Sequence, residues 1–166
     1  MRAGQEISPR KGIPLLDHLP VRHLFDMHVE LEPAQAIATA TGTRLTFIAA
    51  GGQVAGPEVN GQVLPGGGDW LRIGNDRVGR VDVKVSLRTD DGVFIHFESG
   101  GIVKVPDDGL ARLGAGEAVA YDESYVRTTP RFETADERYA WLSQIVTVGY
   151  NALSPDHIEY RIYQVL

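Results

Sequence analysis

The sequence predicts an all-β protein: a single antiparallel barrel that is poor in helix. Three observations predict it. Apolar and polar residues alternate along many short runs, turn residues separate these runs, and only two short segments have a helical pattern. Because closure removes the exposed edges of so many strands, we expect an up-and-down, lipocalin- or calycin-like barrel with a small-molecule lumen; a sandwich is the alternative.

Composition limits the possible classes of function. The chain has 166 residues, of which 43% are hydrophobic and 23% charged, and its formal net charge is -6. These values are typical of one globular domain, and the acidic balance argues against nucleic acid or an anionic membrane as a partner. Cysteine is absent, which excludes disulfides and thiolate chemistry.

The first residues form a separate segment in this interpretation. Residues 1–21 mix charge, glycine and three prolines and are expected to be an N-terminal extension, with the barrel domain at residues 22–166. We see no signal-peptide pattern and no apolar run of the roughly 20 residues that a membrane span needs. The expected location is the cytoplasm.

The first half of the barrel domain begins with a strand at residues 25–32, where apolar and polar residues alternate strictly. Residues 35–41 and 43–50 flank Gly42 and are expected to form a hairpin. The glycine-rich stretch 51–70 follows, and it predicts strand ends, bulges and tight turns that bring the backbone close to other groups.

The clearest alternation lies at residues 80–88, where three valines and a leucine alternate with charged residues and a serine. Asp90-Asp91-Gly92 is a strong turn signal, and the partner strand begins at residues 93–97. The pattern does not say which face of this hairpin lies inside the barrel.

The second half of the chain contains both helical patterns. Residues 106–114 and residues 134–142 each predict a short helix, the second with a capping-box arrangement. Between them, residues 121–132 are rich in β formers. Two final strands are expected at residues 144–153 and 158–165.

Several short motifs occur in an order that resembles a known family. They are Gly42-Thr43-Arg44, Gly51-Gly52, Gly56-Pro57, Gly61-Gln62-Val63-Leu64-Pro65-Gly66-Gly67, Asp69-Trp70, Thr89-Asp90-Asp91-Gly92, Tyr125-Val126-Arg127-Thr128, Phe132-Glu133-Thr134 and Tyr139-Ala140-Trp141-Leu142. Together they resemble the family called domain of unknown function 3237, from about residue 22 to the C-terminus.

The resemblance implies a small, helix-poor β-barrel of bacteria and fungi, with some relatives tied to cofactor-free ring closure or addition chemistry on natural products. Two positions depart from the family pattern. Val126 stands where the pattern has an aromatic residue, and Ser143 stands where it has asparagine. Both changes reduce the size of the side chain.

Asp69 and Trp70 are the first candidate site residues, because they lie where the glycine-rich stretch leads into a strand. A carboxyl group shielded by an indole would have its pKa raised toward the range of a general acid or base. In the alternative interpretation, Asp69 caps a turn and Trp70 fills the end of the barrel.

Asp82 and Arg127 are the other candidate catalytic residues. An arginine directed into a barrel stabilises a developing enolate or carboxylate, and Asp82 would hold it or move a proton. If the valines of residues 80–88 fill the lumen, however, Asp82 lies on a solvated face.

The remaining candidates are expected to contact substrate. Arg44 and Glu133 would bind a polar group, or else form structural ion pairs. Tyr125 would donate a proton to an oxyanion, or else simply pack. Trp141, in one of the family-like motifs, is the last of these residues.

No metal site and no cofactor are expected. His28, Glu30 and Glu32 share one strand face, but a metal ion would need a further ligand from elsewhere, and a wet strand face explains them. No dinucleotide fingerprint, phosphate-binding loop or serine nucleophile elbow is present.

Two main hypotheses follow. The first is a cofactor-independent enzyme of lyase, isomerase or cyclase type that acts on a small oxygenated organic molecule by acid-base groups in the lumen. The second is a carrier that binds such a ligand without changing it. A third interpretation takes the glycine-rich edges as a surface for homo-oligomer formation.

Overall fold

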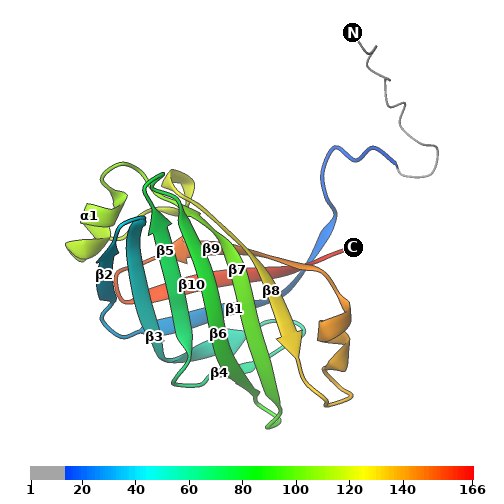
Figure 1. Ribbon diagram of the computed structural model, residues 1–166. Helices are drawn as coiled ribbons and strands as arrows, with labels where there is room; N and C mark the ends of the chain where they lie inside the picture. Colours follow the sequence, from blue (N-terminus) through cyan, green and yellow to red (C-terminus); the bar gives the residue numbers. More distant parts are fainter. Residues whose placement is uncertain (1–13) are drawn as a thin grey trace.

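The structure is a computed structural model that describes residues 14–166. It is made almost entirely of strands (Figure 1). The strands are β1 Val21–Leu31, β2 Gln35–Thr39, β3 Gly42–Ala55, β4 Gly61–Val63, β5 Gly68–Gly74, β6 Gly79–Thr89, β7 Phe94–Lys104, β8 Tyr125–Glu133, β9 Thr147–Leu153 and β10 His157–Val165. The short helices are α1 Gly109–Gly114, and the 3-10 turns η1 Tyr121–Glu123 and η2 Ala140–Gln144.

The sheet closes on itself, which confirms the predicted antiparallel barrel. From β10 back to β6, each strand pairs with the next along the sheet, and the antiparallel pairing of β1 with β3 closes the ring. β4 and β5 occupy one position in this ring, because both pair with β3 on one side and β6 on the other. The closed barrel therefore has eight strand positions.

On one side, the long strand β3 pairs with two different strands along its length, β1 of the barrel and the short strand β2. Its second half, Ala49–Ala55, pairs with β1, and its first half, Gly42–Thr46, pairs with β2. β2 continues the line of β1 along β3, but within the described residues it pairs with no second strand and all five of its residues are exposed. The barrel wall is thus incomplete at the end where β2 lies.

The alternation along β6 places its apolar residues inside. Val83, Val85 and Leu87 are buried, whereas Arg80, Asp82, Lys84, Ser86 and Arg88 are exposed. This arrangement follows from the two-residue period of a strand, because one face must pack on the interior if the other faces water. The charged residues of this strand therefore form a solvated outer face.

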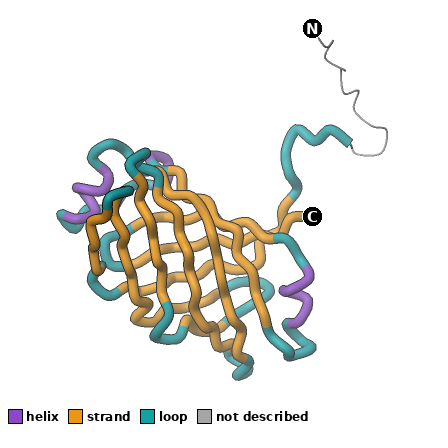
Figure 2. Tube along the Cα trace, in the orientation of Figure 1, coloured by secondary structure: helices purple, strands orange, loops and turns teal. Residues whose placement is uncertain are grey.

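One end of the barrel is packed solid. Phe132 makes edge-to-face contacts with Phe25 and Phe97, at ring-centroid distances of 5.7 and 5.5 Å. Leu24 and Leu142 are also buried in this core, which η2 covers at the end of the barrel away from α1 (Figures 1 and 2). Any open interior must lie toward the other end, where α1 and β2 are found.

The predicted helices form only in part. The first is confirmed in shortened form as α1, whereas residues 134–136 have no regular structure, residues 137–139 form a turn, and the 3-10 turn η2 follows. The polar side chains explain this difference: Thr134 Oγ1 accepts a bond from the Asp136 amide, and the Asp136 carboxylate accepts bonds from the backbone and guanidinium of Arg138. These bonds close local turns instead of capping an α-helix.

The predicted N-terminal extension lies only partly within the described residues. Residues 14–20 form neither helix nor strand and are exposed, and residues 1–13 lie outside the description. In the part of the chain that is described, no helix has the length and apolar character needed to cross a membrane.

The turn between β4 and β5 provides a test of the fold. Gly66 and Gly67 both have positive φ, at 92° and 71°. A Cβ on Gly67 would lie 2.3 Å from the Lys84 carbonyl oxygen, whereas a Cβ on Gly66 would meet nothing within 4 Å. We predict that G66A lowers the free energy of unfolding by about 1 kcal/mol, from backbone strain alone. G67A should lower it by about 3 kcal/mol, because β6 must also move away.

Urea unfolding followed by circular dichroism measures both values. G66A is the matched control, since it carries the same backbone strain at the neighbouring position. Equal losses in the two variants would show that β5 does not approach β6 as closely as described.

Candidate functional site

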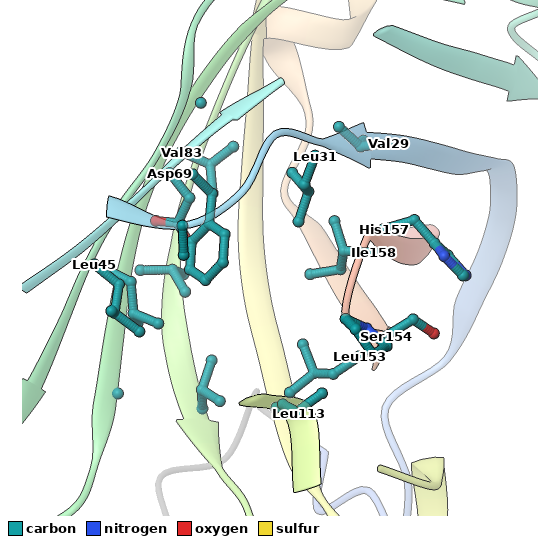
Figure 3. A pocket seen from close by; sticks show the side chains of 18 of the residues that line it. Val29, Leu31, Leu45, Asp69, Val83, Leu113, Leu153, Ser154, His157 and Ile158 are labelled. Atoms are coloured by element: carbon teal, nitrogen blue, oxygen red, sulfur yellow. The ribbon is translucent and has the colours of Figure 1, made fainter. Parts of the chain in front are cut away.

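The barrel encloses a cavity of about 550 Å³. Its walls are mainly apolar and come from the inward faces of β1, β3, β5 and β6, with Met27, Leu45, Phe47, Val83 and Val85 among them. Figure 3 shows Asp69, Leu45 and Val83 on one side of this space. A cavity of this size and character is suited to a small organic molecule.

The rim of the cavity is built from three separate segments. Leu110 and Leu113 come from α1, Ser154 and neighbouring residues come from the turn between β9 and β10, and Arg77 comes from the turn between β5 and β6. Arg77 also bonds the loop before α1, donating to the Asp107 carboxylate and to the Asp107 carbonyl, both at 2.8 Å. The short helix is thereby tied to the barrel wall at the mouth.

Asp69 brings a carboxyl group to the wall of this apolar space. It lies near the start of β5, where the pairing with β6 runs from Asp69–Val83 to Arg72–Arg80 and skips the two residues between. The amide of Asp82 lies in this gap and donates a hydrogen bond to Asp69 Oδ1 at 2.9 Å. The Asp69 carboxylate thus takes the place of the backbone carbonyl that would accept this bond in a regular sheet. Its second oxygen remains available to the cavity.

The pKa of Asp69 is raised from 3.8 to about 6. Burial is the largest cause, because an apolar cavity disfavours the charged carboxylate. The bond from the Asp82 amide opposes this shift, and the negative charge of Asp82 adds to it. Asp69 is therefore able to gain and lose a proton near neutral pH.

Tyr160 is a second polar residue of the cavity wall. It projects inward from β10 between Ile158 and Ile162, is buried, and packs edge-to-face on Phe97 at 6.0 Å between ring centroids. Burial raises the pKa of its hydroxyl far above the usual range, and the negative charge of Asp69 raises it further. Tyr160 therefore stays protonated and can donate a hydrogen bond.

The two groups have complementary chemistry. Near neutral pH, Asp69 is mainly a carboxylate that can accept a proton, and Tyr160 is a neutral donor. In a water-poor space, both act more strongly on a bound molecule than they would in solution. The arrangement can remove a proton from a ligand and stabilise an oxygen on which negative charge develops.

The other predicted catalytic residues lie outside the cavity. The Asp82 side chain is 62% exposed and pairs with Lys84, so that only its backbone amide serves the site. Arg127 lies on the outer face, where its guanidinium stacks on the rings of Tyr121, Tyr125 and Tyr150 at 5.0, 5.0 and 4.2 Å. The two-residue period of β8 explains this position, because its neighbours Val126 and Thr128 point inward and are buried.

The predicted substrate-contacting residues are also absent from the cavity wall. Arg44 and Glu133 are exposed on β3 and β8, and Trp70 and Tyr125 are exposed on the outer faces of β5 and β8. Trp141 packs against the closed end, where its indole N–H donates to the Arg138 carbonyl at 3.1 Å. Of the eight side chains predicted from the sequence, the structure brings only that of Asp69 to the cavity.

Sequence reasoning missed Tyr160, although a signal was present. Ile158, Tyr160 and Ile162 alternate with Glu159 and Arg161, and this pattern assigns the tyrosine to the inward face of the last strand. The motif Tyr125-Val126-Arg127-Thr128 instead favoured Tyr125, which is exposed on the outer face of β8. In the described part of the chain, the only group of three side chains suited to a metal ion is His28, His157 and Glu159, and it lies on the outer face of β1 and β10.

Sequence comparison identifies relatives over most of the chain. A family model described as "Protein of unknown function (DUF3237)" matches residues 19–165. A UPF0311 protein of Rhodopseudomonas palustris is 38% identical over 149 residues, covering 89% of this chain and 97% of the relative. A UPF0311 protein of Bradyrhizobium diazoefficiens is 35% identical with the same coverage.

Solved structures share the barrel. A conserved protein of unknown function from Rhodopseudomonas palustris superposes with a TM-score of 0.86 at 33% identity, covering 91% of this chain and 100% of the other. A β-barrel-like protein from Acinetobacter baumannii gives 0.77 at 26% identity, covering 95% and 100%. A protein described as an enzyme from Penicillium herquei gives 0.65 at 20% identity, covering 93% and 100%, and this likeness concerns the fold alone.

The raised pKa of Asp69 predicts a specific pH dependence of stability. Since the folded pKa of about 6 lies above the unfolded value of 3.8, folding stability falls as pH rises between these values, by up to about 3 kcal/mol. We predict that D69N, which keeps an acceptor for the Asp82 amide, is more stable than the wild type by about that amount above pH 6. This difference should disappear below pH 4.

Chemical denaturation at a series of pH values measures the free energy of unfolding of D69N and of the wild type. Subtracting one from the other cancels the contributions of the other titratable groups. E98Q serves as the control, because it removes a carboxylate that faces Arg131 on the outer side of β7 and does not contact Asp69. A difference between D69N and wild type that does not change with pH would contradict the raised pKa.

Proposed function

Because the chain belongs to the DUF3237 family of proteins of unknown function, its role has to be inferred from its own site, and we propose that it is a cofactor-independent acid-base enzyme acting on a small oxygenated organic molecule. The reaction is of lyase, isomerase or cyclase type. The observation that carries this proposal is a carboxyl group with a pKa of about 6, on the wall of an apolar cavity that also holds a protonated tyrosine.

The cavity favours a ligand with an apolar body and few polar atoms. Its volume of about 550 Å³ falls in the range for drug-sized ligands, and its walls are mostly aliphatic. An anionic ligand would lose its hydration without a cationic partner deep in the cavity, since Arg77 lies at the rim. A neutral ring or chain with a carbonyl or hydroxyl group fits these conditions.

The proposed chemistry moves protons only. The Asp69 carboxylate takes a proton from a carbon next to a carbonyl group, or from a hydroxyl group, and the electron pair of the broken bond stays on the ligand. Tyr160 donates a hydrogen bond to the oxygen on which the negative charge collects. Asp69 then returns the proton to another carbon of the ligand, which shifts a double bond, or to the carbon left negative after an internal hydroxyl group has added to a double bond, which closes a ring. In an elimination, the proton goes instead to the oxygen of the leaving group, which departs as water or an alcohol. None of these steps oxidises or reduces the ligand.

The comparison with the Penicillium herquei protein supports this proposal at the level of the scaffold. That protein is described as an enzyme and has the same barrel fold. At 20% identity, the likeness supports the use of such a barrel for catalysis but does not identify a substrate for this chain.

A carrier is the second candidate, and a specific feature favours it. The rim is largely apolar, with Leu110 and Leu113 of α1 beside the opening, and such a surface suits uptake of a poorly soluble ligand. The same cavity would then hold its ligand without a reaction. Proton transfer to a bound molecule separates the two functions.

We predict that the protein catalyses exchange of the α-protons of 2-tetralone or cyclohexanone with deuterium from D₂O, as followed by proton NMR. The rate should rise as pH increases through about 6, since the carboxylate is the active form of Asp69. D69N should reduce the rate to that of the buffer, and Y160F should reduce it by about 100-fold. E98Q, which alters a carboxylate of β7 that faces Arg131 outside the barrel, should leave the rate unchanged.

Calorimetric titration of the same ketones completes this experiment. The carrier is favoured if the wild type binds the ketones, if D69L binds them more weakly, and if the wild type does not exchange their α-protons faster than the buffer does. Exchange that proceeds equally in wild type and D69N would remove Asp69 from the mechanism.

A further inference from the structure

The outer surface of the barrel carries a group of side chains that the proposed acid-base chemistry does not use. It lies where β1 pairs with β10, and it consists of His28 from β1 and His157 and Glu159 from β10. We propose that these three residues bind a divalent transition-metal ion, with zinc as the best fit. The sequence alone showed only His28 on a wet strand face, because the other two ligands lie more than a hundred positions away.

The geometry brings three ligand atoms to one point. His28 Nδ1 lies 2.5 Å from Glu159 Oε1, and His157 Nε2 lies 3.8 Å from the same oxygen. The two imidazole rings are 4.7 Å apart between centroids, and the ligand atoms of the group all lie within 4.8 Å of one another. Ligands of a tetrahedral zinc ion lie about 3.3 Å apart, given bonds of about 2.0 Å, so small side-chain rotations suffice.

His157 is already oriented as a metal ligand. Its Nδ1 lies 2.7 Å from Asp156 Oδ1, a contact in which the imidazole donates its N–H to the carboxylate. In the neutral imidazole, the lone pair is then on Nε2, which faces Glu159. A carboxylate that fixes the tautomer of a ligating histidine is a recurrent feature of zinc sites.

The local charge leaves room for a cation. Arg161 lies on the same outer face, but its guanidinium is bound to Asp26 by two hydrogen bonds of 2.9 and 2.7 Å. Among residues 14–166, the side-chain partners of Glu159 are the two histidines, and Glu30 lies opposite His157 in the pairing of the two strands. Two imidazoles and one carboxylate match zinc, and water would complete its coordination.

The position of the group gives the metal a structural role. β1 and β10 are the first and last strands of the barrel, and His157 lies next to the turn that forms part of the cavity rim. Figure 3 shows the His157 ring turned away from the cavity toward this outer side. A bound ion would join the two strands and fix the turn at the rim, next to the cavity that His157 also lines.

Cobalt titration of the tag-free, metal-free protein tests this proposal, because tetrahedral cobalt has strong visible absorption bands. We expect one cobalt ion per chain, displaced by zinc, and a higher melting temperature in the presence of zinc. H28A and E159Q should each weaken binding at least tenfold, and D156N should weaken it about tenfold through the orientation of His157. H23A is the matched control, because His23 bonds Asp26 at 2.8 Å on the same strand but has no third ligand.

Two results would overturn the metal site. One is the absence of cobalt bands together with a melting temperature that zinc does not change. The other is binding by H28A and E159Q that equals the wild type, since the metal would then bind elsewhere. Melting in the presence of a chelator shows whether each variant is folded, and H157Q provides a third ligand substitution if one of the first two is not.

Discussion

One carboxyl group in an apolar tube is the constraint on which the rest of the site depends. Asp69 is held there by a backbone amide, because the ladder between β5 and β6 is interrupted and the Asp82 N–H turns to the side chain. This single bond stabilises the carboxylate only in part, so that burial still raises its pKa to about 6. A fully bonded carboxylate would stay charged and inert, and one without any partner would not be tolerated in the wall of the barrel.

The barrel supplies the other conditions that this carboxyl group needs. Eight strand positions leave an interior wide enough for one small ligand when the wall residues are of moderate size. The aromatic core of Phe25, Phe97 and Phe132 closes one end, and the cavity extends to α1 and to the segment just before β2. Phe97 also fixes Tyr160, which joins the packed core to the chemistry of the cavity. The packed core that stabilises the barrel thus lies at one end, and the candidate active site lies toward the other.

The sequence predicted the fold better than the site. Strand periodicity and turn residues were sufficient for the barrel, because each strand needs only one apolar face. The same period explains why Arg127 was misplaced: it shares β8 with buried Val126 and Thr128 and must point outward. Asp69 was found because glycine-rich surroundings marked its segment. The contribution of the Asp82 amide and the meeting of distant strands at Tyr160 depend on register, which no single segment of sequence contains.

The central claim is that Asp69 is a partly buried acid-base group on the wall of the cavity. Titration of its side-chain carboxyl carbon by NMR, assigned by comparison with D69N, tests this claim most directly. We predict a midpoint near pH 6 in the protein without ligand. A midpoint near pH 4, the value of a carboxyl group in water, would show that the cavity does not shift its ionisation and would contradict the account.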